Sequence, residues 1–133
     1  MLRYMLYTDI ASYIMKGSEP AVMRRLAKAA VGELCISAIS KAELSYGVEI
    51  SPRAAVDRER LDVLLRHLEV LDFPQNAATD YAQIRAWLKK RGTMIGANDL
   101  LIAAHARCGG LTLVTNNVRE FQRVPGLKLE NWC

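Results

Sequence analysis

Cysteine is scarce in this chain of 133 residues, and its three cysteines, Cys35, Cys108 and Cys133, lie far apart. No C-x-x-C pair is present, so the sequence indicates neither a disulfide framework nor a zinc site. His105 and Cys108 are three residues apart, but two side chains are too few for a metal site, and we interpret them as packing residues. This cysteine usage is typical of a reducing cytosol.

Long apolar runs are also absent. No stretch approaches the ~20 residues that a membrane-spanning helix needs. The apolar run near the N-terminus is broken at Thr8 and Asp9, which makes it too short for a signal peptide. The sequence has no Gly-rich phosphate-binding loop, which disfavours a nucleoside triphosphate enzyme. We therefore expect a soluble, cytoplasmic protein that is not associated with a membrane.

What is present is an ordinary globular composition, with 51% hydrophobic and 24% charged residues. No linker, repeat or low-complexity tract divides the chain, so we expect a single domain over residues 1–133. The net charge of +4 favours a polyanionic partner only mildly. The densest basic patch is WLKKRG (87–92), where Trp87 lies beside the cations. A solvated helix end is one interpretation of this patch, and nucleic-acid binding is the other.

Short β-prone runs alternate with helical patterns along the chain. This order predicts an α/β sandwich around a mostly parallel sheet of about five strands. The expected strands are 2–6, 34–37, 69–73, 111–117 and 127–132, and the expected helices include residues 9–16, 20–31, 41–50, 52–68, 74–91 and 97–108. Helix starts are expected at Thr8 or Asp9, at Ser18, at Ser37 or Ser40 and at Pro74, and helix ends at Gly17, Gly32 and Gly92.

Ligand sites in parallel sheets form at the carboxyl ends of the strands, where strand order reverses. Polar residues occupy such positions in three parts of the sequence, and two glutamates follow close behind. These residues are Tyr7, Thr8 and Asp9 after the first strand, Asn98 and Asp99 at the start of a helix, Thr115, Asn116 and Asn117 after the fourth strand, and Glu43 and Glu120.

Glu43 is the most informative of these residues, because it lies within a helical stripe of apolar side chains. Leu44 and Val48 make the other side of that helix apolar too, so we expect the helix to be covered on both sides. A buried carboxylate needs a partner, although a Glu that reaches solvent or an arginine explains the pattern equally well. The stripe consists of Ile39, Ala42, Tyr46 and Ile50.

The remaining acidic positions also have purely structural interpretations. Asp99 falls in the first turn of a helix, where the helix dipole stabilises a carboxylate without any catalytic role. One cap residue suffices, however, and Asn98 is adjacent to it. Asn117 and Glu120 have the spacing of a capping box at one helical turn. Function and local structure therefore both remain open for these residues.

Carboxylates gathered at one sheet edge repel one another unless a cation neutralises them. Oxygen ligands without nitrogen or sulfur select Mg²⁺ or Mn²⁺ over zinc. Such ions activate water and stabilise the charge that develops in in-line phosphodiester hydrolysis. The pattern therefore favours metal-dependent phosphodiester chemistry.

In order, the motifs are a strand followed by Y-T-D, then K-A-E-L (41–44), N-D-L-L-I-A-A-H-A (98–106) and T-N-N-V-R-E-F (115–121). Together they resemble a PIN-domain ribonuclease, most closely the VapC toxins of bacterial VapBC toxin–antitoxin modules. The resemblance implies a PIN-like α/β/α sandwich and a Mg²⁺- or Mn²⁺-dependent endoribonuclease. It also implies inhibition by a VapB antitoxin, a homodimer within a larger toxin–antitoxin complex, and cleavage of tRNA, notably the anticodon region of initiator tRNA.

The resemblance also assigns roles to individual residues. It places Glu43 and Asp99 at metal-binding positions and Asn117 and Glu120 at further catalytic positions. Thr8, Asn98, Thr115 and Asn116 would orient the site.

Position 7 departs from the family pattern, which has Asp there as the first metal ligand and Asn two residues later. This chain has Tyr7 and Asp9 instead. A neutral phenol, with an ordinary pKa of about 10, is a poor Mg²⁺ ligand. Asp9 points to the same side of an extended segment but is displaced by roughly 6.6 Å along it. Asp9 is therefore at most a partial substitute.

Three hypotheses follow from this departure. In the first, the chain is a VapC-type endoribonuclease whose activity Tyr7 reduces or abolishes. In the second, it is a catalytically silent module that still binds antitoxin or RNA. In the third, it is an active nuclease that uses Asp9 in a rearranged site.

Overall fold

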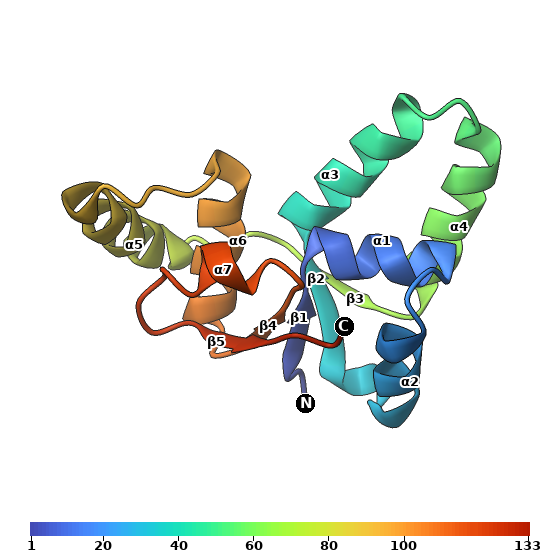
Figure 1. Cartoon of the computed structure of the whole chain (residues 1–133), viewed down its shortest axis with the longest axis horizontal. Coiled ribbons are helices and arrows are strands. Elements are labelled where there is room, and N and C mark those ends of the chain that lie inside the picture. Colours follow the sequence, from blue (N-terminus) through green and yellow to red (C-terminus); the bar gives the residue numbers. More distant parts are fainter.

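The computed structural model describes all 133 residues as a five-stranded, wholly parallel sheet in the order β3-β2-β1-β4-β5 (Figure 1). The predicted α/β class is therefore confirmed. The strands are β1 (Tyr4–Leu6), β2 (Leu34–Ser37), β3 (Glu69–Leu71), β4 (Thr112–Val114) and β5 (Lys128–Glu130). The helices are α1 (Thr8–Lys16), α2 (Pro20–Lys28), α3 (Ala38–Glu49), α4 (Ala54–Arg66), α5 (Ala77–Arg91), α6 (Ala97–Cys108) and α7 (Val118–Phe121), with a 3₁₀ turn at Val31–Glu33.

Helices cover both faces of the sheet, with α1–α4 on one side and α5–α7 on the other (Figure 1). The central strand β1 is completely buried and contributes to both cores. Met5 packs with the α5–α6 side, whereas Tyr4 and Leu6 pack with the α1, α2 and α4 side. A strand that is buried on both faces reads as a continuous apolar run, which explains the YML sequence of β1.

Strand β1 is also the point where strand order reverses. The chain moves from β1 outward through β2 to β3, and then returns to β4 on the other side of β1. Leu6 pairs with Val114, and the Tyr7 N–H donates to the Val114 carbonyl at 2.9 Å. The carboxyl ends of β1 and β4 are therefore level, and the polar residues after them emerge at one edge.

Several helix boundaries differ from the sequence-based expectation. The residue preceding α1 is Tyr7, whose side chain makes no capping hydrogen bond, and α2 is preceded by Glu19 rather than Ser18. Helix α2 ends at Lys28 and not at Gly32, since a 3₁₀ turn intervenes. Helix α5 begins three residues after Pro74.

Other predicted boundaries are confirmed. The Ser37 hydroxyl accepts the Ile39 N–H at 3.1 Å and caps α3. Gly17 and Gly92 end α1 and α5 with left-handed φ angles of 61° and 64°, which a residue with a side chain rarely adopts.

Helix α3 is not covered on both sides, contrary to expectation. Leu44 and Val48 are buried against the core, but Tyr46 and Ile50 are 65% and 64% exposed. The reason is that α3 pairs with α4 in a hairpin that projects from the body of the molecule (Figure 1). None of the helices has the length and apolarity that crossing a membrane requires.

Candidate active site

The structure brings Tyr7, Glu43, Asn98 and Asp99 together around a cavity of about 330 Å³, which Gly96 and Ala97 complete. Tyr7 comes from the end of β1, Glu43 from the second turn of α3, and Asp99 from the first turn of α6. This is the sheet edge at which sequence reasoning placed the site.

A short hydrogen bond joins two of these side chains, because the Tyr7 hydroxyl donates to Asp99 Oδ1 at 2.6 Å. The phenol ring also packs edge-on against Phe121, with ring centroids 4.9 Å apart. Burial, the hydrogen bond to Asp99 and the surrounding carboxylates raise the pKa of Tyr7 well above its ordinary value. Tyr7 is therefore a neutral donor at physiological pH.

Asp99 is electrostatically perturbed. Burial raises the pKa of its carboxyl group to about 6; the Tyr7 hydrogen bond opposes this shift, whereas Glu120 and Glu43 add to it. Ionised carboxylates that lie close together disfavour one another's charge. A raised pKa of this kind is characteristic of functional sites.

Glu43 is held from two directions. Thr8 Oγ1 donates to Glu43 Oε1 at 2.6 Å and lies 3.1 Å from the Ser40 hydroxyl, while Asn98 Nδ2 approaches Glu43 Oε2 at 3.5 Å. Thr8 and Asn98 therefore contact the two oxygens of the Glu43 carboxylate from opposite elements. Sequence reasoning missed Ser40 as a member of this group, although it precedes Glu43 by three residues and so lies on the same side of α3.

Glu120 reaches the same region from α7. The Gly96 N–H donates to Glu120 Oε1 at 3.1 Å, and Asn117 Nδ2 donates to Glu120 Oε2 at 2.5 Å. The capping-box interpretation is wrong, because the Asn117 side chain makes no capping bond to the backbone of α7. The Asn117 N–H is satisfied instead by the Thr115 hydroxyl at 2.9 Å. Asn117 and Glu120 thus form one unit that faces Gly96.

Gly96 is the second residue that sequence reasoning missed. A Cβ atom at this position would lie 3.1 Å from Asp99 Oδ2, closer than ordinary van der Waals contact. The signal was a glycine at a helix start, two residues before an Asn-Asp pair, a place where a small residue lets the backbone approach a side chain.

Asp9 is directed elsewhere. Its Oδ2 accepts from the Asn116 N–H at 3.0 Å and from the Thr115 hydroxyl at 3.2 Å, and its Oδ1 accepts from the Ile10 N–H at 2.6 Å. Burial raises the pKa of Asp9 although these hydrogen bonds oppose the shift. None of its hydrogen bonds reaches Glu43 or Asp99, so Asp9 ties the β1–α1 connection to the β4–α7 connection.

Carboxylate oxygens are the ligand type that a hard divalent cation prefers, but these side chains are not grouped closely enough to surround one. No group of three or more His, Cys, Asp or Glu side chains is positioned to hold a metal ion. Tyr7 occupies one oxygen of Asp99, and Thr8 occupies one oxygen of Glu43. The geometry offers two carboxylates flanking the cavity, and a phenol where the resemblance places a third.

The structure shows how His105 is packed. His105 is buried, its Nδ1 lies 2.9 Å from the Ser37 hydroxyl, and its ring packs edge-on against Phe73. Burial lowers the pKa of His105. It is therefore a neutral core residue.

Comparison with known proteins places this geometry in a family. The PIN domain family matches residues 4–127. The chain is 43% identical over 132 residues to ribonuclease VapC2 of Haemophilus influenzae, with 99% of each chain covered. It is 40% identical over 133 residues to the tRNA(fMet)-specific endonuclease VapC of Salmonella typhimurium, with both chains fully covered.

A solved structure agrees with these matches. The crystal structure of VapBC2 from Rickettsia felis, bound to a DNA fragment from its promoter, contains a chain that is 41% identical and superposes with a TM-score of 0.93, covering 99% of this chain and 100% of that one. Three observations agree on the family: strand order reverses at β1, acidic residues lie at the carboxyl edge of the sheet, and the relatives match over the whole length. The chain belongs to the PIN-domain VapC ribonucleases, the toxins of VapBC toxin–antitoxin systems.

Proposed function

We propose that this chain is a VapC-type endoribonuclease, formed by a single PIN domain, whose cleavage activity is impaired by Tyr7. The observation that carries the proposal is the 2.6 Å bond from the Tyr7 hydroxyl to Asp99. A carboxylate at position 7 would present negative charge to the cavity, whereas the phenol presents a donor that occupies Asp99. The fold and the other acidic residues are retained.

Glu43 and Asp99 are the residues that would hold Mg²⁺ or Mn²⁺, and with one carboxylate fewer they would hold it weakly. When bound, such an ion supplies an activated water and neutralises developing phosphate charge. Thr8 and Asn98 fix the direction of the Glu43 carboxylate. Asn117 orients Glu120 toward the start of α6.

The proposed substrate is tRNA, with the anticodon region of initiator tRNA as the specific candidate. The similarity to a tRNA(fMet)-specific endonuclease over the full length of both chains supports this choice. A tRNA substrate would place the action of the protein in the cytoplasm, where initiator tRNA is found.

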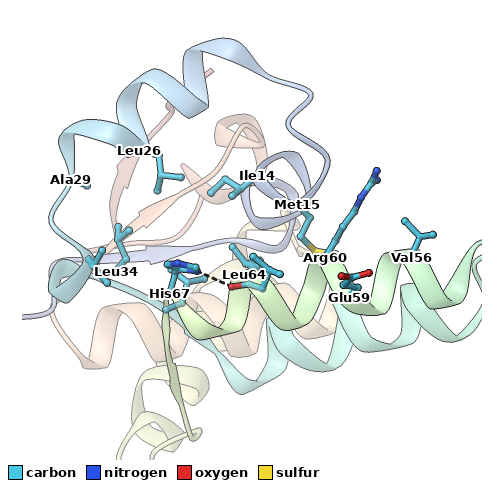
Figure 2. A pocket seen from close by; sticks show the side chains of 13 residues that line it. Ile14, Met15, Leu26, Ala29, Leu34, Val56, Glu59, Arg60, Leu64 and His67 are labelled. Atoms are coloured by element: carbon cyan, nitrogen blue, oxygen red, sulfur yellow. Dashed lines mark hydrogen bonds between the residues drawn. The ribbon is translucent and has the colours of Figure 1, made fainter.

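The proposed inhibitor is a VapB-type antitoxin. An apolar groove of about 580 Å³ lies between α1, α2 and α4 and is mostly hydrophobic (Figure 2). Ile14, Met15 and Leu26 face Leu64 across it, and Val56 and Val63 along its α4 side are 46% and 43% exposed. A partner helix with an apolar face fits such a groove. Solved structures of relatives are VapBC complexes, and we expect a homodimer within a larger complex of this kind.

The proposal is tested by comparing the purified chain, freed of any partner, with a Tyr7→Asp variant on initiator tRNA and on bulk tRNA with Mg²⁺ or Mn²⁺. We expect the variant to cleave at least tenfold faster. A Tyr7→Phe variant is the matched control, because it releases Asp99 without adding a carboxylate, and it should remain as slow as the parent. Equal rates for the parent and Tyr7→Asp would reject impairment by Tyr7.

Two other outcomes identify the alternatives. Cleavage by the parent that disappears on Asp9→Ala, in a variant shown by its unfolding midpoint to be folded at the assay temperature, would establish the rearranged site. Antitoxin binding without cleavage by either the parent or Tyr7→Asp would establish a silent binding module.

A further inference from the structure

The end of α5 and the connection after it form a segment without acidic side chains. Residues 81–98 contain no Asp or Glu but include Arg85, Lys89, Lys90 and Arg91. All four cations are exposed, and none takes part in an ion pair. An unneutralised basic surface of this kind attracts polyanions.

Trp87 lies within this segment with 42% of its surface exposed, whereas the only other tryptophan, Trp132, is 5% exposed. The Arg91 guanidinium carbon lies 3.2 Å from the centroid of the Trp87 ring. Lys90 and Arg91 follow Trp87 by three and four residues on α5, so all three side chains share one side of the helix. Cations at a helix C-terminus are explained by the helix dipole, but that effect does not account for an exposed indole.

A short connection joins this patch to the first turn of α6, which carries Asp99. Only residues 92–96 separate α5 from α6, and Figure 1 shows this connection returning from the end of α5 to the start of α6. An extended chain advances at most about 3.6 Å per residue, so the end of α5 lies within roughly 20 Å of the first turn of α6. Arg123 Nη1 donates to the Met94 carbonyl, and the Gly96 N–H donates to the Glu120 carboxylate. These two hydrogen bonds hold the connection against α7 and the residues after it.

We propose that Trp87, Lys90 and Arg91 form a docking surface for an unpaired segment of the RNA substrate. A base stacks on the Trp87–Arg91 pair while Lys90 and the free edge of Arg91 contact phosphates. Exposed aromatic rings beside cations bind single-stranded RNA in this way, because every base offers a stacking face. The inference rests on the proposed function, and it adds the surface that directs an RNA loop toward Asp99.

Tryptophan fluorescence tests the stacking directly. The full-length chain is titrated with a single-stranded RNA oligonucleotide and with initiator tRNA, and a Trp87→Phe variant supplies the background emission of buried Trp132. We expect RNA to quench the component due to Trp87 and to leave the Trp132 component unchanged. An RNA duplex without unpaired bases should compete at least fivefold less well.

A matched pair of charge variants separates local contact from general attraction. Lys90→Gln with Arg91→Gln should weaken RNA binding at least fivefold and reduce the salt dependence of binding, since each lost phosphate contact lowers the slope by about 0.7. Arg24→Gln with Lys28→Gln removes the same charge from exposed, unpaired positions on α2 and should weaken binding less than twofold. Thermal unfolding midpoints confirm that each variant is folded.

Four results would overturn the proposal. RNA binding that leaves Trp87 emission unchanged would exclude stacking. Equal losses of RNA affinity in the α5 and α2 charge variants would show that binding depends on the overall positive charge and not on this patch. Variants at Trp87, Lys90 and Arg91 that weaken antitoxin binding but not RNA binding would assign the surface to a protein partner. If a Tyr7→Asp protein still cleaves RNA equally fast when Trp87, Lys90 and Arg91 are also substituted, the docking surface is rejected and the proposed function is not. If the Tyr7→Asp protein neither binds nor cleaves any RNA, the proposed function is rejected as well.

Discussion

Tyr7 and Asp99, 92 residues apart in sequence, are joined by a 2.6 Å hydrogen bond at the carboxyl edge of the sheet. This bond links the end of β1 to the start of α6 and fills the position where the family resemblance places a metal-binding carboxylate. Carboxylates that would otherwise repel are separated by a neutral donor. The neutral phenol therefore adds no negative charge to this edge of the sheet.

Gly96 should be needed for the site but not for the fold. A Cβ atom there would lie 3.1 Å from Asp99 Oδ2, so Gly96→Ala should displace the Asp99 carboxylate. Introduced into the Tyr7→Asp variant, it should lower the RNA cleavage rate at least fivefold. Gly47→Ala is the control, because nothing lies within 4 Å of a Cβ there and alanine favours the helix by up to about 1 kcal/mol. Equal effects of the two substitutions would contradict this prediction.

Asp9 should contribute to stability. Asp9→Ala leaves the Asn116 N–H and the Thr115 hydroxyl without their acceptor, and unpaired groups of this kind cost about 1–3 kcal/mol each when buried. We expect the free energy of unfolding in urea to fall by about 1–3 kcal/mol. An unchanged free energy would show that Asp9 does not hold the two connections together.

Arg107 should be the most important cation for the fold. Its guanidinium bonds Asp80 at 2.7 Å, the Pro125 carbonyl at 3.1 Å and Gln83, and its side chain is only 18% exposed. Arg107→Ala should lower the free energy of unfolding by about 3 kcal/mol, because it leaves partly buried Asp80 unpaired. Arg58→Ala breaks an exposed pair with Glu49 and should cost less than about 1 kcal/mol. Chemical denaturation of both variants measures the contrast.

His105 should make stability depend on pH. Burial lowers the pKa of His105 in the folded state, so the unfolded state binds a proton at higher pH than the folded state does. The contribution of neutral His105 to the free energy of unfolding is fully present above the unfolded-state pKa of about 6.5. It is lost as pH falls toward the folded-state pKa. The difference in unfolding free energy between the parent and His105→Gln should therefore shrink or reverse between pH 7.5 and 5.5.

The comparison with His105→Gln isolates this histidine. The pKa of Asp99 is raised to about 6, and this carboxyl group acts in the opposite sense, since the folded state gains a proton first as pH falls. Asp99 is present in both proteins and cancels in the difference. A difference that does not change with pH would show that His105 titrates alike in both states.

Local patterns predicted the position of each strand and the ends of α1 and α5, although the strands are shorter than expected, as where the predicted run 111–117 forms β4 only over Thr112–Val114. A buried β run and a glycine with a left-handed φ are properties of a few neighbouring residues. The start of α5 and the exposed side of α3 were predicted wrongly, because they depend on contacts between elements and not on neighbouring residues. Tyr46 and Ile50 form an apolar stripe with Glu43, and only the packing of α3 against α4 decides that this stripe faces solvent.

The candidate site shows the same division. The topology rule placed Tyr7, Glu43 and Asp99 at one edge from the sequence alone. The partners of each side chain could not be predicted, because they come from different elements. Thr8 bonds Glu43, Asp9 turns to Asn116, and Gly96 approaches Asp99 through contacts between residues that are far apart in sequence.

Cation binding tests the central claim most directly, because it needs neither substrate nor turnover. Calorimetric titration with Mn²⁺ of the partner-free parent, Tyr7→Phe and Tyr7→Asp compares a phenol, a benzyl group and a carboxylate at one position. The account predicts at least tenfold tighter binding by Tyr7→Asp than by either of the others, with a thermal midpoint that rises with Mn²⁺ only in that variant. Equally tight binding by the parent and Tyr7→Asp would contradict it.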